Sequence, residues 1–267
     1  MEPLVRDSAT QLDPTTRGRV VVCGSHGGIY PAWLSARAGV RAALFNDAGV
    51  GRSSSGVGGL FWLGGLGIPA CAVSHESARI GDGADAFEHG ILSTVNDAAA
   101  ALGCRPGQRC KEATAHLAHA HPTGVLPIPD IGETRAPIPN AGHRPAWLLD
   151  SVALVEPRDA RSIVVTGSHG GLLAGGQADA TLGTDVFAAF FNDAGGGKDG
   201  AGFARLPVLD ARGIVAATVW CGSARIGDGR STFEDGVLSR VNETGARLGL
   251  AEGMAAREAV ARLLGLA

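Results

Sequence analysis

Apolar residues along this chain occur either in short β-branched runs or in longer stretches with helical spacing. A short, continuous apolar run is typical of a strand buried on both faces, whereas apolar residues three and four positions apart indicate a helix packed on one side. By these criteria we expect strands at 20–23, 40–45, 68–73, 163–166, 186–191 and 214–219, and helices at 30–38, 57–66, 84–102, 107–118, 230–248 and 252–265. Strands that alternate with helices predict βαβ units and a mostly parallel sheet.

One segment of the chain occurs twice. Residues 46–103 and 192–249 align without a gap, and 29 of the 58 aligned positions are identical. Similarity at a fixed offset indicates a tandem duplication. We therefore predict an α/β fold that consists of two Rossmann-like βαβ units with mostly parallel sheets, related by a pseudo-twofold axis. The units are expected at 1–119 and 148–267, each beginning with a further strand near an Asp-Ser pair (7–8 and 150–151).

The region 120–147 has no counterpart in the duplication and is rich in proline. Proline lacks the N–H group that a helix or a central strand needs, so we expect an extended linker. Two interpretations remain open. The linker is either a passive tether between the units or an arm that covers a site or a partner subunit.

The identity between the two copies gathers in three polar motifs. They are Gly-Ser-His-Gly-Gly (24–28 and 167–171), Asn-Asp-Ala-Gly-x-Gly (46–51 and 192–197) and Ser-Ala-Arg-Ile-Gly-Asp-Gly (77–83 and 223–229). Each motif begins where a predicted strand ends, or shortly after it. Ligands of parallel α/β sheets bind beyond the carboxyl ends of the strands. The three motifs therefore predict a site, and the duplication predicts two half-sites.

The first motif has three interpretations. It resembles a relaxed nucleophile elbow, with Ser25 as the nucleophile and Cys23 where the usual first glycine stands. It also suits a glycine-rich turn that presents backbone N–H groups to an anion at a helix N-terminus. The third interpretation is a tight turn in which the serine only caps a helix. The residues concerned are Ser25, His26, Gly27 and Gly28 and their counterparts Ser168, His169, Gly170 and Gly171.

The second motif places an amide and a carboxylate at a strand end. The carboxylate of Asp47 or Asp193 suits a general base, a metal ligand or a group that orients a histidine. The alternative is an Asx-turn, in which these side chains bond their own backbone. Asn46 and Asn192 are expected to contact substrate, as is Lys198, whose counterpart Arg52 keeps the positive charge.

The third motif is identical in all seven positions. Its arginine, Arg79 or Arg225, suits two-pronged binding of a carboxylate or phosphate. Its aspartate, Asp82 or Asp228, suits acid–base chemistry or a divalent cation. The alternative is an internal Arg–Asp salt bridge that braces a loop. Ser77 and Ser223 complete the set of expected substrate-binding residues.

Composition narrows the classes of function. A formal charge of −3 without a basic cluster argues against nucleic-acid binding, and no run reaches the ~18 apolar residues of a membrane span. The five irregularly spaced cysteines and the absence of a secretory signal at the start of the sequence favour reduced thiols and a cytoplasmic location. The cofactor stays unknown. A divalent metal at His26, Asp47 and Asp82 is one hypothesis, although no short-range ligand spacing supports it.

Several differences between the copies lie beside the motifs, among them Cys23/Thr166, His75/Cys221, Glu76/Gly222, Arg52/Lys198 and Ser53/Asp199. They favour one composite site in which matched residues have unlike roles, with His75 and Cys221 as acid–base and nucleophile candidates. Two separate sites are the alternative. Homo-oligomerisation is left open.

The leading hypothesis from the sequence is a metabolic enzyme that acts on a small, carboxylate-bearing anion as a hydrolase or lyase. The expected catalytic residues are Ser25, His26, Asp47, Asp82, Ser168, His169, Asp193 and Asp228. In this hypothesis the glycine-rich loops supply N–H groups to an oxyanion and the histidines transfer protons. The alternatives are a nonenzymatic nucleotide- or metabolite-binding protein that uses the same loops, and a scaffold whose loops are only structural.

Overall fold

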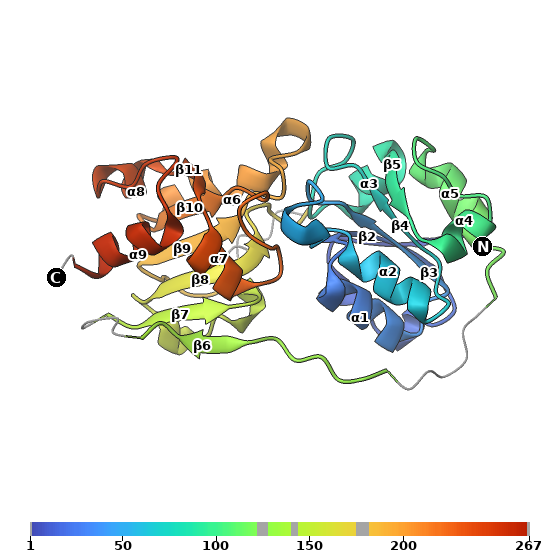
Figure 1. Cartoon of the computed structure of the whole chain (residues 1–267), viewed down its shortest axis with the longest axis horizontal. Helices are drawn as coiled ribbons and strands as arrows, with labels where there is room; N and C mark the ends of the chain where they lie inside the picture. Colours follow the sequence, from blue (N-terminus) through green and yellow to red (C-terminus); the bar gives the residue numbers. More distant parts are fainter. Residues whose placement is uncertain (1, 122–127, 140–143, 175–181, 266–267) are drawn as a thin grey trace.

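The chain forms two α/β halves that lie side by side. The computed structural model describes residues 2–121, 128–139, 144–174 and 182–265. Figure 1 shows the first half in blue to green and the second in yellow to red. Residues 128–139, the described part of the segment that connects the halves (the connecting segment), run along one edge of both. Within the described residues, no helix is both long and apolar enough to cross a membrane.

The first half contains a five-stranded sheet in the order β1-β2-β3-β4-β5. Its strands are β1 (Leu4–Arg6), β2 (Val20–His26), β3 (Ala42–Asn46), β4 (Ala70–Val73) and β5 (Leu92–Val95). The first four are parallel, and β5 pairs with β4 in the antiparallel sense. Every residue of β2, β3 and β4 is buried, as expected for strands covered on both faces.

The second half contains a six-stranded sheet in the order β11-β10-β9-β8-β7-β6. Its strands are β6 (Arg135–Pro137), β7 (Ala146–Leu149), β8 (Ile163–His169), β9 (Ala188–Asn192), β10 (Val215–Val219) and β11 (Leu238–Val241). Strands β7 to β10 are parallel, whereas the edge strands β6 and β11 are antiparallel to their neighbours. From β7 to β11 the order is that of β1 to β5 in the first half.

Helices cover both sheets. In the first half they are α1 (Ile29–Ala38), α2 (Gly58–Gly65), α3 (Gly83–His89), α4 (Asp97–Ala101) and α5 (Cys110–Leu117). In the second half they are α6 (Arg205–Asp210), α7 (Gly229–Asp235), α8 (Glu243–Arg247) and α9 (Ala256–Leu264). Short 3-10 helices complete the loops: η1 (Ala9–Gln11), η2 (Pro14–Thr16), η3 (Arg52–Ser54), η4 (Val152–Leu154), η5 (Pro157–Asp159) and η7 (Lys198–Phe203). Each half has two apolar core clusters built from its own strands and helices.

The single long helices predicted at 84–102 and 230–248 are wrong. Each range contains a helix, an antiparallel strand and a second short helix. Gly90 is the C-cap of α3, and a Cβ atom there would come within 2.3 Å of the Ala86 carbonyl oxygen, so the position requires glycine. Asn96 then caps α4, and its side chain also bonds the main chain at Leu60, Ile68 and Ala70. The strand is therefore held by a buried polar residue that the helical pattern does not reveal.

The connecting segment contributes to the second half. Of the predicted linker 120–147, residues 122–127 and 140–143 lie outside the described residues. Strand β6 pairs with β7, and its Pro137 lies in an edge strand, where the missing N–H is tolerated. Upstream of β6, the indole N–H of Trp33 donates to the carbonyl oxygen of Pro129 at 2.8 Å. The segment thus contacts both halves.

Loops at the carboxyl ends of the strands join the two halves. The backbone N–H of Arg52 donates to the Cys221 carbonyl, and that of Lys198 donates to the His75 carbonyl, both at 2.8 Å. Ala48, Ile80, Ala194 and Ile226 form a small buried apolar cluster between the halves. Beside it Gly49 and Gly195 meet, and a Cβ atom built on either would lie 3.0 Å from the Cα of the other.

Candidate functional site

A cavity of about 810 Å³ lies between the halves. The carboxyl ends of β2 and β8 reach it from opposite sides and bring Ser25 and His26, and Ser168 and His169, into its wall. Other polar residues around it come from helices, loops and the connecting segment: Tyr30, Ser53, Ser54, Ser55, Glu133, Asp150, Ser151, Arg205, Arg225 and Asp228. The first motif of both copies therefore borders one common cavity.

Both motif histidines are neutral at pH 7, with the proton on Nε2. The Nδ1 atom of His26 accepts the N–H of Gly28 at 3.1 Å, and that of His169 accepts the N–H of Gly171 at 3.2 Å. A ring nitrogen that accepts a hydrogen bond carries no proton, so Nε2–H is the remaining donor. Burial lowers the pKa of His26 to about 4 and that of His169 to about 3. The positive charges of Arg205 and of a protonated His26 contribute to this lowered pKa of His169.

The glycines of the first motif shape the loop around its histidine. The N–H groups of Gly27 and Gly170 donate to the carbonyl oxygens of Asn46 and Asn192 at 2.9 and 2.8 Å. A Cβ atom on Gly28 would lie 2.6 Å from Nδ1 of His26, so a side chain there would displace the imidazole. These four N–H groups, expected to hold an oxyanion, donate to acceptors of the protein itself. The imidazole Nε2–H groups are the donors that the loops offer to a ligand.

The motif serines hold segments that connect two neighbouring strands of each sheet, β1 to β2 and β7 to β8. Oγ of Ser25 accepts the N–H of Ala9 at 2.9 Å, and Oγ of Ser168 accepts the N–H of Val152 at 2.8 Å. Each bond ties a 3-10 helix, η1 or η4, to the end of the neighbouring strand. Both serines border the cavity, but their observed contacts are structural.

The asparagines of the second motif are buried and bonded to the main chain. Nδ2 of Asn46 donates to the Ala78 carbonyl at 3.0 Å, and its Oδ1 accepts the N–H of Ala48 at 2.9 Å. Asn192 makes the same pair of bonds to Ala224 and Ala194. Both side chains are inaccessible and position the loops, and neither borders the cavity.

The aspartates of the second motif have different partners in the two halves. Oδ1 of Asp47 lies 2.8 Å from Nδ1 of His75, so Asp47 orients His75 and not His26. The counterpart Asp193 accepts the N–H of Cys221 at 2.8 Å. The hydrogen bond and charge of Asp47 raise the pKa of His75, whereas burial raises the pKa of the Cys221 thiol to about 11. His75 and Cys221 do not line the cavity.

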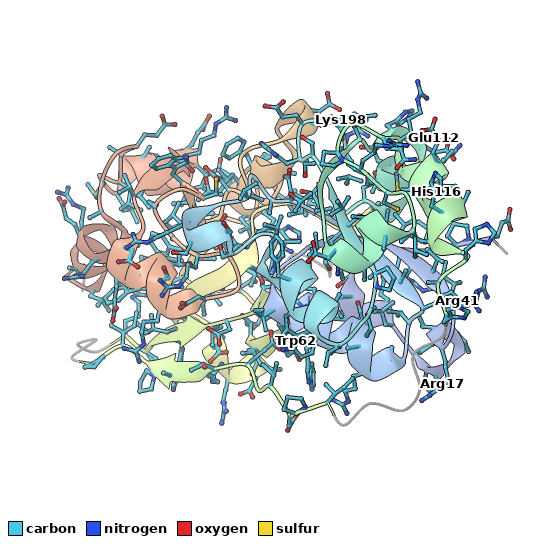
Figure 2. All side chains as sticks on the ribbon, turned by 45° about the vertical axis from the view of Figure 1, so that its right-hand side comes forward. Arg17, Arg41, Trp62, Glu112, His116 and Lys198 are labelled. Atoms are coloured by element: carbon cyan, nitrogen blue, oxygen red, sulfur yellow. The ribbon has the colours of Figure 1, made fainter. Side chains whose placement is uncertain are left out.

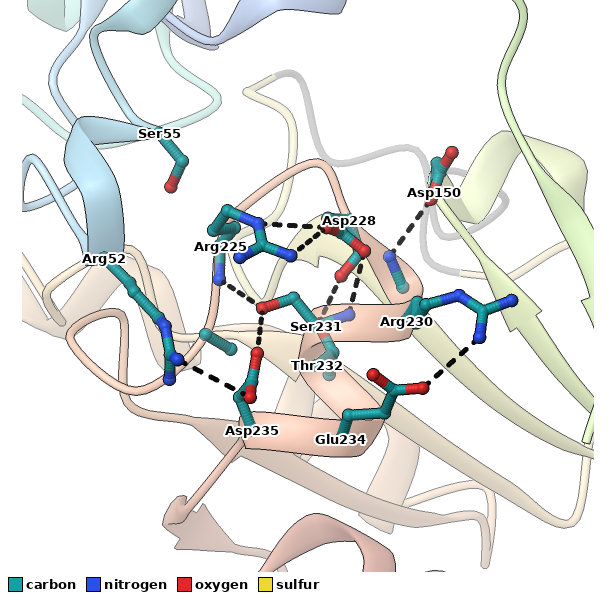
Figure 3. Close-up of polar contacts among 12 residues, drawn as sticks. Arg52, Ser55, Asp150, Arg225, Asp228, Arg230, Ser231, Thr232, Glu234 and Asp235 are labelled. Atoms are coloured by element: carbon teal, nitrogen blue, oxygen red, sulfur yellow. Dashed lines mark hydrogen bonds and ion pairs between the residues drawn. The ribbon is translucent and has the colours of Figure 1, made fainter.

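Some residues of the third motif only hold the local structure, whereas others also line the cavity. Oγ of Ser77 and Oγ of Ser223 donate to the carbonyls of Ser74 and Trp220 at 2.8 and 2.7 Å. Asp82 and Asp228 cap the helices α3 and α7 with one carboxylate oxygen each. Figure 3 shows the other oxygen of Asp228 in contact with Arg225, near Asp150. Nε and Nη2 of Arg225 lie 3.1 and 2.9 Å from that oxygen.

Arg79 has the same place in its motif as Arg225 but faces other residues. Its guanidinium contacts Asp85 at 3.1 Å and Asp199 of the second half at 2.5 Å. Asp85 also binds Nζ of Lys198 at 2.7 Å, so the expected substrate-binding Lys198 joins the halves instead. Figure 2 shows Lys198 in the loop where the second half approaches the first. Arg225, and not Arg79, borders the cavity.

Four ionisable residues among the described residues of the cavity wall were not expected as site residues. Arg205 is buried at the start of α6, where its Nε donates to the Gly171 carbonyl at 2.9 Å. Burial lowers the pKa of Arg205 to about 10, which leaves it charged at pH 7. Its counterpart is Gly59, so this difference between the copies was a usable signal. The others are Tyr30, the one tyrosine of the chain, Glu133 of the connecting segment, and Asp150.

No metal site is evident in the part of the chain that the structure describes, because it contains no group of three His, Cys, Asp or Glu side chains placed to share an ion. Of the proposed ligands, Asp47 is engaged with His75, and Asp82 caps α3. The geometry therefore gives no support to a metal at His26, Asp47 and Asp82.

No protein-family model matches this chain, and comparisons with curated proteins and with solved structures gave no match either. The cavity and its residues are therefore the basis for the function proposed below.

Proposed function

We propose that this protein is an enzyme that performs acid–base chemistry on a small, carboxylate-bearing substrate, as a hydrolase or a lyase. The substrate would bind in the cavity between the halves. In this proposal the halves are two copies of one unit, related by a pseudo-twofold axis, and the site is composite. The carrying observation is that His26 and His169, from opposite halves, border the same cavity as neutral hydrogen-bond donors.

The charges of the cavity wall support an anionic substrate. Arg225 is paired with Asp228 in a bond that a substrate carboxylate can share or replace, and its guanidinium suits two parallel hydrogen bonds. Arg205 adds a second positive charge behind the His169 loop. The two Nε2–H groups then suit an oxygen that gains negative charge in the transition state, because they donate without needing to be protonated.

A nonenzymatic metabolite-binding protein is the second candidate. Its support is that the serines, the asparagines and the loop N–H groups of the motifs are bonded to the protein itself. A protein that only binds its ligand needs no more than the Nε2–H groups of the two histidines and the arginines.

One experiment separates the two candidates. Small mono- and dicarboxylates, with their amides and esters, would be tested for binding by calorimetry and for turnover by NMR. For an enzyme, His26→Asn should abolish turnover and leave binding almost intact, whereas a binding protein should show a modest loss of affinity and no turnover in either form. If no member of the panel binds to the wild-type protein, the proposal is wrong.

A further inference from the structure

Glu133 is fixed in the cavity wall by its neighbours in the connecting segment. Pro129 is held by Trp33, as described above, and the N–H of Thr134 donates to Oδ2 of Asp150 at 2.7 Å. Glu133 lies between these two anchors, in the cavity wall with Tyr30 and Ser151, whose hydroxyls act on its carboxyl group. The segment is thus held in place at the cavity, with one carboxyl group facing it from this segment.

The three carboxyl groups that the described residues contribute to the cavity wall differ in the donors that hold them. Asp150 accepts backbone N–H groups from Thr134 and Gly229. Asp228 accepts the N–H of Ser231 and the guanidinium of Arg225. These donors cannot become acceptors, so a protonated Asp150 or Asp228 would lose hydrogen bonds.

Glu133 is different because no backbone N–H or guanidinium of the described residues donates to its carboxyl group, and the polar groups that act on it include the hydroxyls of Tyr30 and Ser151. A hydroxyl that donates to a carboxylate can rotate and accept from a carboxylic acid. Glu133 can therefore gain and lose a proton without leaving a partner unsatisfied. Burial and the nearby charge of Asp150 raise the pKa of Glu133, although the hydroxyls of Tyr30 and Ser151 act in the opposite direction. A raised pKa brings a carboxylate closer to the basicity that proton abstraction at neutral pH requires.

The histidines cannot take this role as they stand. Their Nδ1 atoms are engaged by Gly28 and Gly171, and their Nε2 atoms already carry protons. They are donors, and the cavity needs a separate acceptor for a proton.

We infer that Glu133 is the catalytic base and that the substrate is a small carboxylate with a C–H bond next to a carbonyl group. This inference rests on the proposed function and assigns its proton-transfer step. The C–H bond breaks, its proton forms an O–H bond with the Glu133 carboxylate, and the electron pair moves to the carbonyl oxygen. His26 and His169 donate Nε2–H bonds to that oxygen, while Arg225 holds the substrate carboxylate. Loss of a group from the neighbouring carbon completes a lyase reaction, and a probe without such a group takes up a proton from the solvent instead.

The test is exchange of carbon-bound hydrogen for deuterium in D2O, followed by NMR. The probes are pyruvate, 2-oxobutyrate and 2-oxoglutarate, each also measured for binding by calorimetry. We expect at least one probe to bind and to exchange about 100-fold faster than in buffer, a typical contribution of a positioned base. Glu133→Gln should remove this acceleration and change the Kd less than about threefold. Glu112→Gln, on α5 and away from the cavity (Figure 2), is the matched control and should behave as wild type.

The pH dependence of the exchange rate provides a second test. A glutamate with only a structural role would not determine this dependence. Exchange should rise with pH as Glu133 loses its proton, with a midpoint above the ordinary glutamate pKa of 4.5. Tyr30→Phe removes a hydroxyl that lowers the pKa of Glu133, so the midpoint should move upward. This variant leaves Glu133 in place and serves if Glu133→Gln does not fold.

The outcomes are distinguishable. If a probe exchanges and Glu133→Gln exchanges equally fast, Glu133 is not the base, and the proposed function survives. Glu133 is likewise not the base if a probe binds to the wild-type protein without exchange. If none of the probes binds or exchanges, this substrate class is wrong, and the wider carboxylate panel decides the proposed function separately.

Discussion

The motif at 77–83 and its copy at 223–229 have the same seven residues and different contacts. Arg79 is drawn to Asp85 and Asp199, so it joins the two halves on the surface. In the second half the position of Asp85 is taken by Ser231, whose neutral hydroxyl accepts only the backbone N–H of Arg225. The guanidinium of Arg225 is then available to Asp228 at the cavity. A residue outside the motif therefore decides what the motif's arginine contacts.

The aspartates of the second motif give the same lesson. Asp47 and Asp193 bond the backbone in the same way, yet one orients an imidazole and the other lies beside a thiol. Sequence identity marks the shared scaffold of the two halves, and the differences between them mark where the chemistry is asymmetric. Four measurements test this comparison.

The largest effect is expected at the histidines, where the two halves should be equivalent. His26→Asn and His169→Asn, made separately, should each lower kcat by about 100- to 1000-fold, because each removes a donor to the developing oxyanion. Turnover would be followed by NMR on a substrate found with the carboxylate panel. A large loss of kcat in one variant and none in the other would contradict the composite site.

Substitution of the two arginines should have unequal effects on ligand binding, in contrast to the equal effects expected for the two histidines. Arg225→Gln should weaken binding of a small carboxylate by about 10- to 100-fold, as expected for a charged hydrogen bond inside a cavity. Arg79→Gln is the matched control in the identical motif, and its affinity should equal that of wild type. Calorimetry measures both. Equal losses from the two variants would show that the difference at Asp85 and Ser231 does not matter for binding.

Asp85→Asn should reduce the stability of the protein by about 1–3 kcal/mol, because it removes the charge that holds Lys198 and Arg79. Although burial acts in the other direction, Lys198, Arg79 and the backbone lower the pKa of Asp85 from its ordinary 3.8. A lowered carboxyl pKa stabilises the fold above the ordinary value, and this contribution is lost as the pH falls through the lowered value.

Chemical denaturation between pH 2 and pH 6 therefore checks Asp85. The wild-type protein should lose more stability than Asp85→Asn in the acid range. Ser231→Ala is the control at the matched position and removes no charge. If the stability of the wild-type protein and that of Asp85→Asn changed equally as the pH falls, Asp85 would not have the role of holding Lys198 and Arg79.

The smallest effect is expected at His75. Its hydrogen bond to Asp47 raises the pKa of His75 above the ordinary 6.5. A raised histidine pKa contributes stability that is complete below the ordinary value and is lost as the pH rises through the raised value. His75→Gln should remove this dependence, worth less than about 1 kcal/mol for a partly exposed pair. Denaturation curves from pH 5 to pH 8 measure it, and Cys221→Ser should leave the slope in this range unchanged, because the thiol stays protonated in the folded and unfolded states there.

The sequence predicted the parallel core of each half well. Continuous apolar runs located β2, β3, β4, β8, β9 and β10, because strands buried on both faces leave a simple pattern. The strands β5 and β11 were mistaken for helix. Their half-buried residues occur at spacings that also fit a helix, and the decisive contacts of Asn96 and Asn242 are with residues distant in the sequence.

The candidate site was predicted in part. Strand ends brought the two histidines to one cavity, as the position of the first motif indicated. Glu133 and Tyr30 were missed because they belong to no shared motif and meet only in the folded chain. The equivalence expected of Arg79 and Arg225 failed for a physical reason, since the partner of a charged side chain depends on the charges around it.

The contact between Gly49 and Gly195 makes two positions behave as one in any redesign of the chain. Each lies against the main chain of the other, and each has a positive φ, of 73° and 79° respectively. A side chain added at either would meet backbone that no second substitution can shorten. Libraries that vary the two positions together should therefore return glycine at both, a pairwise constraint that neither half imposes by itself.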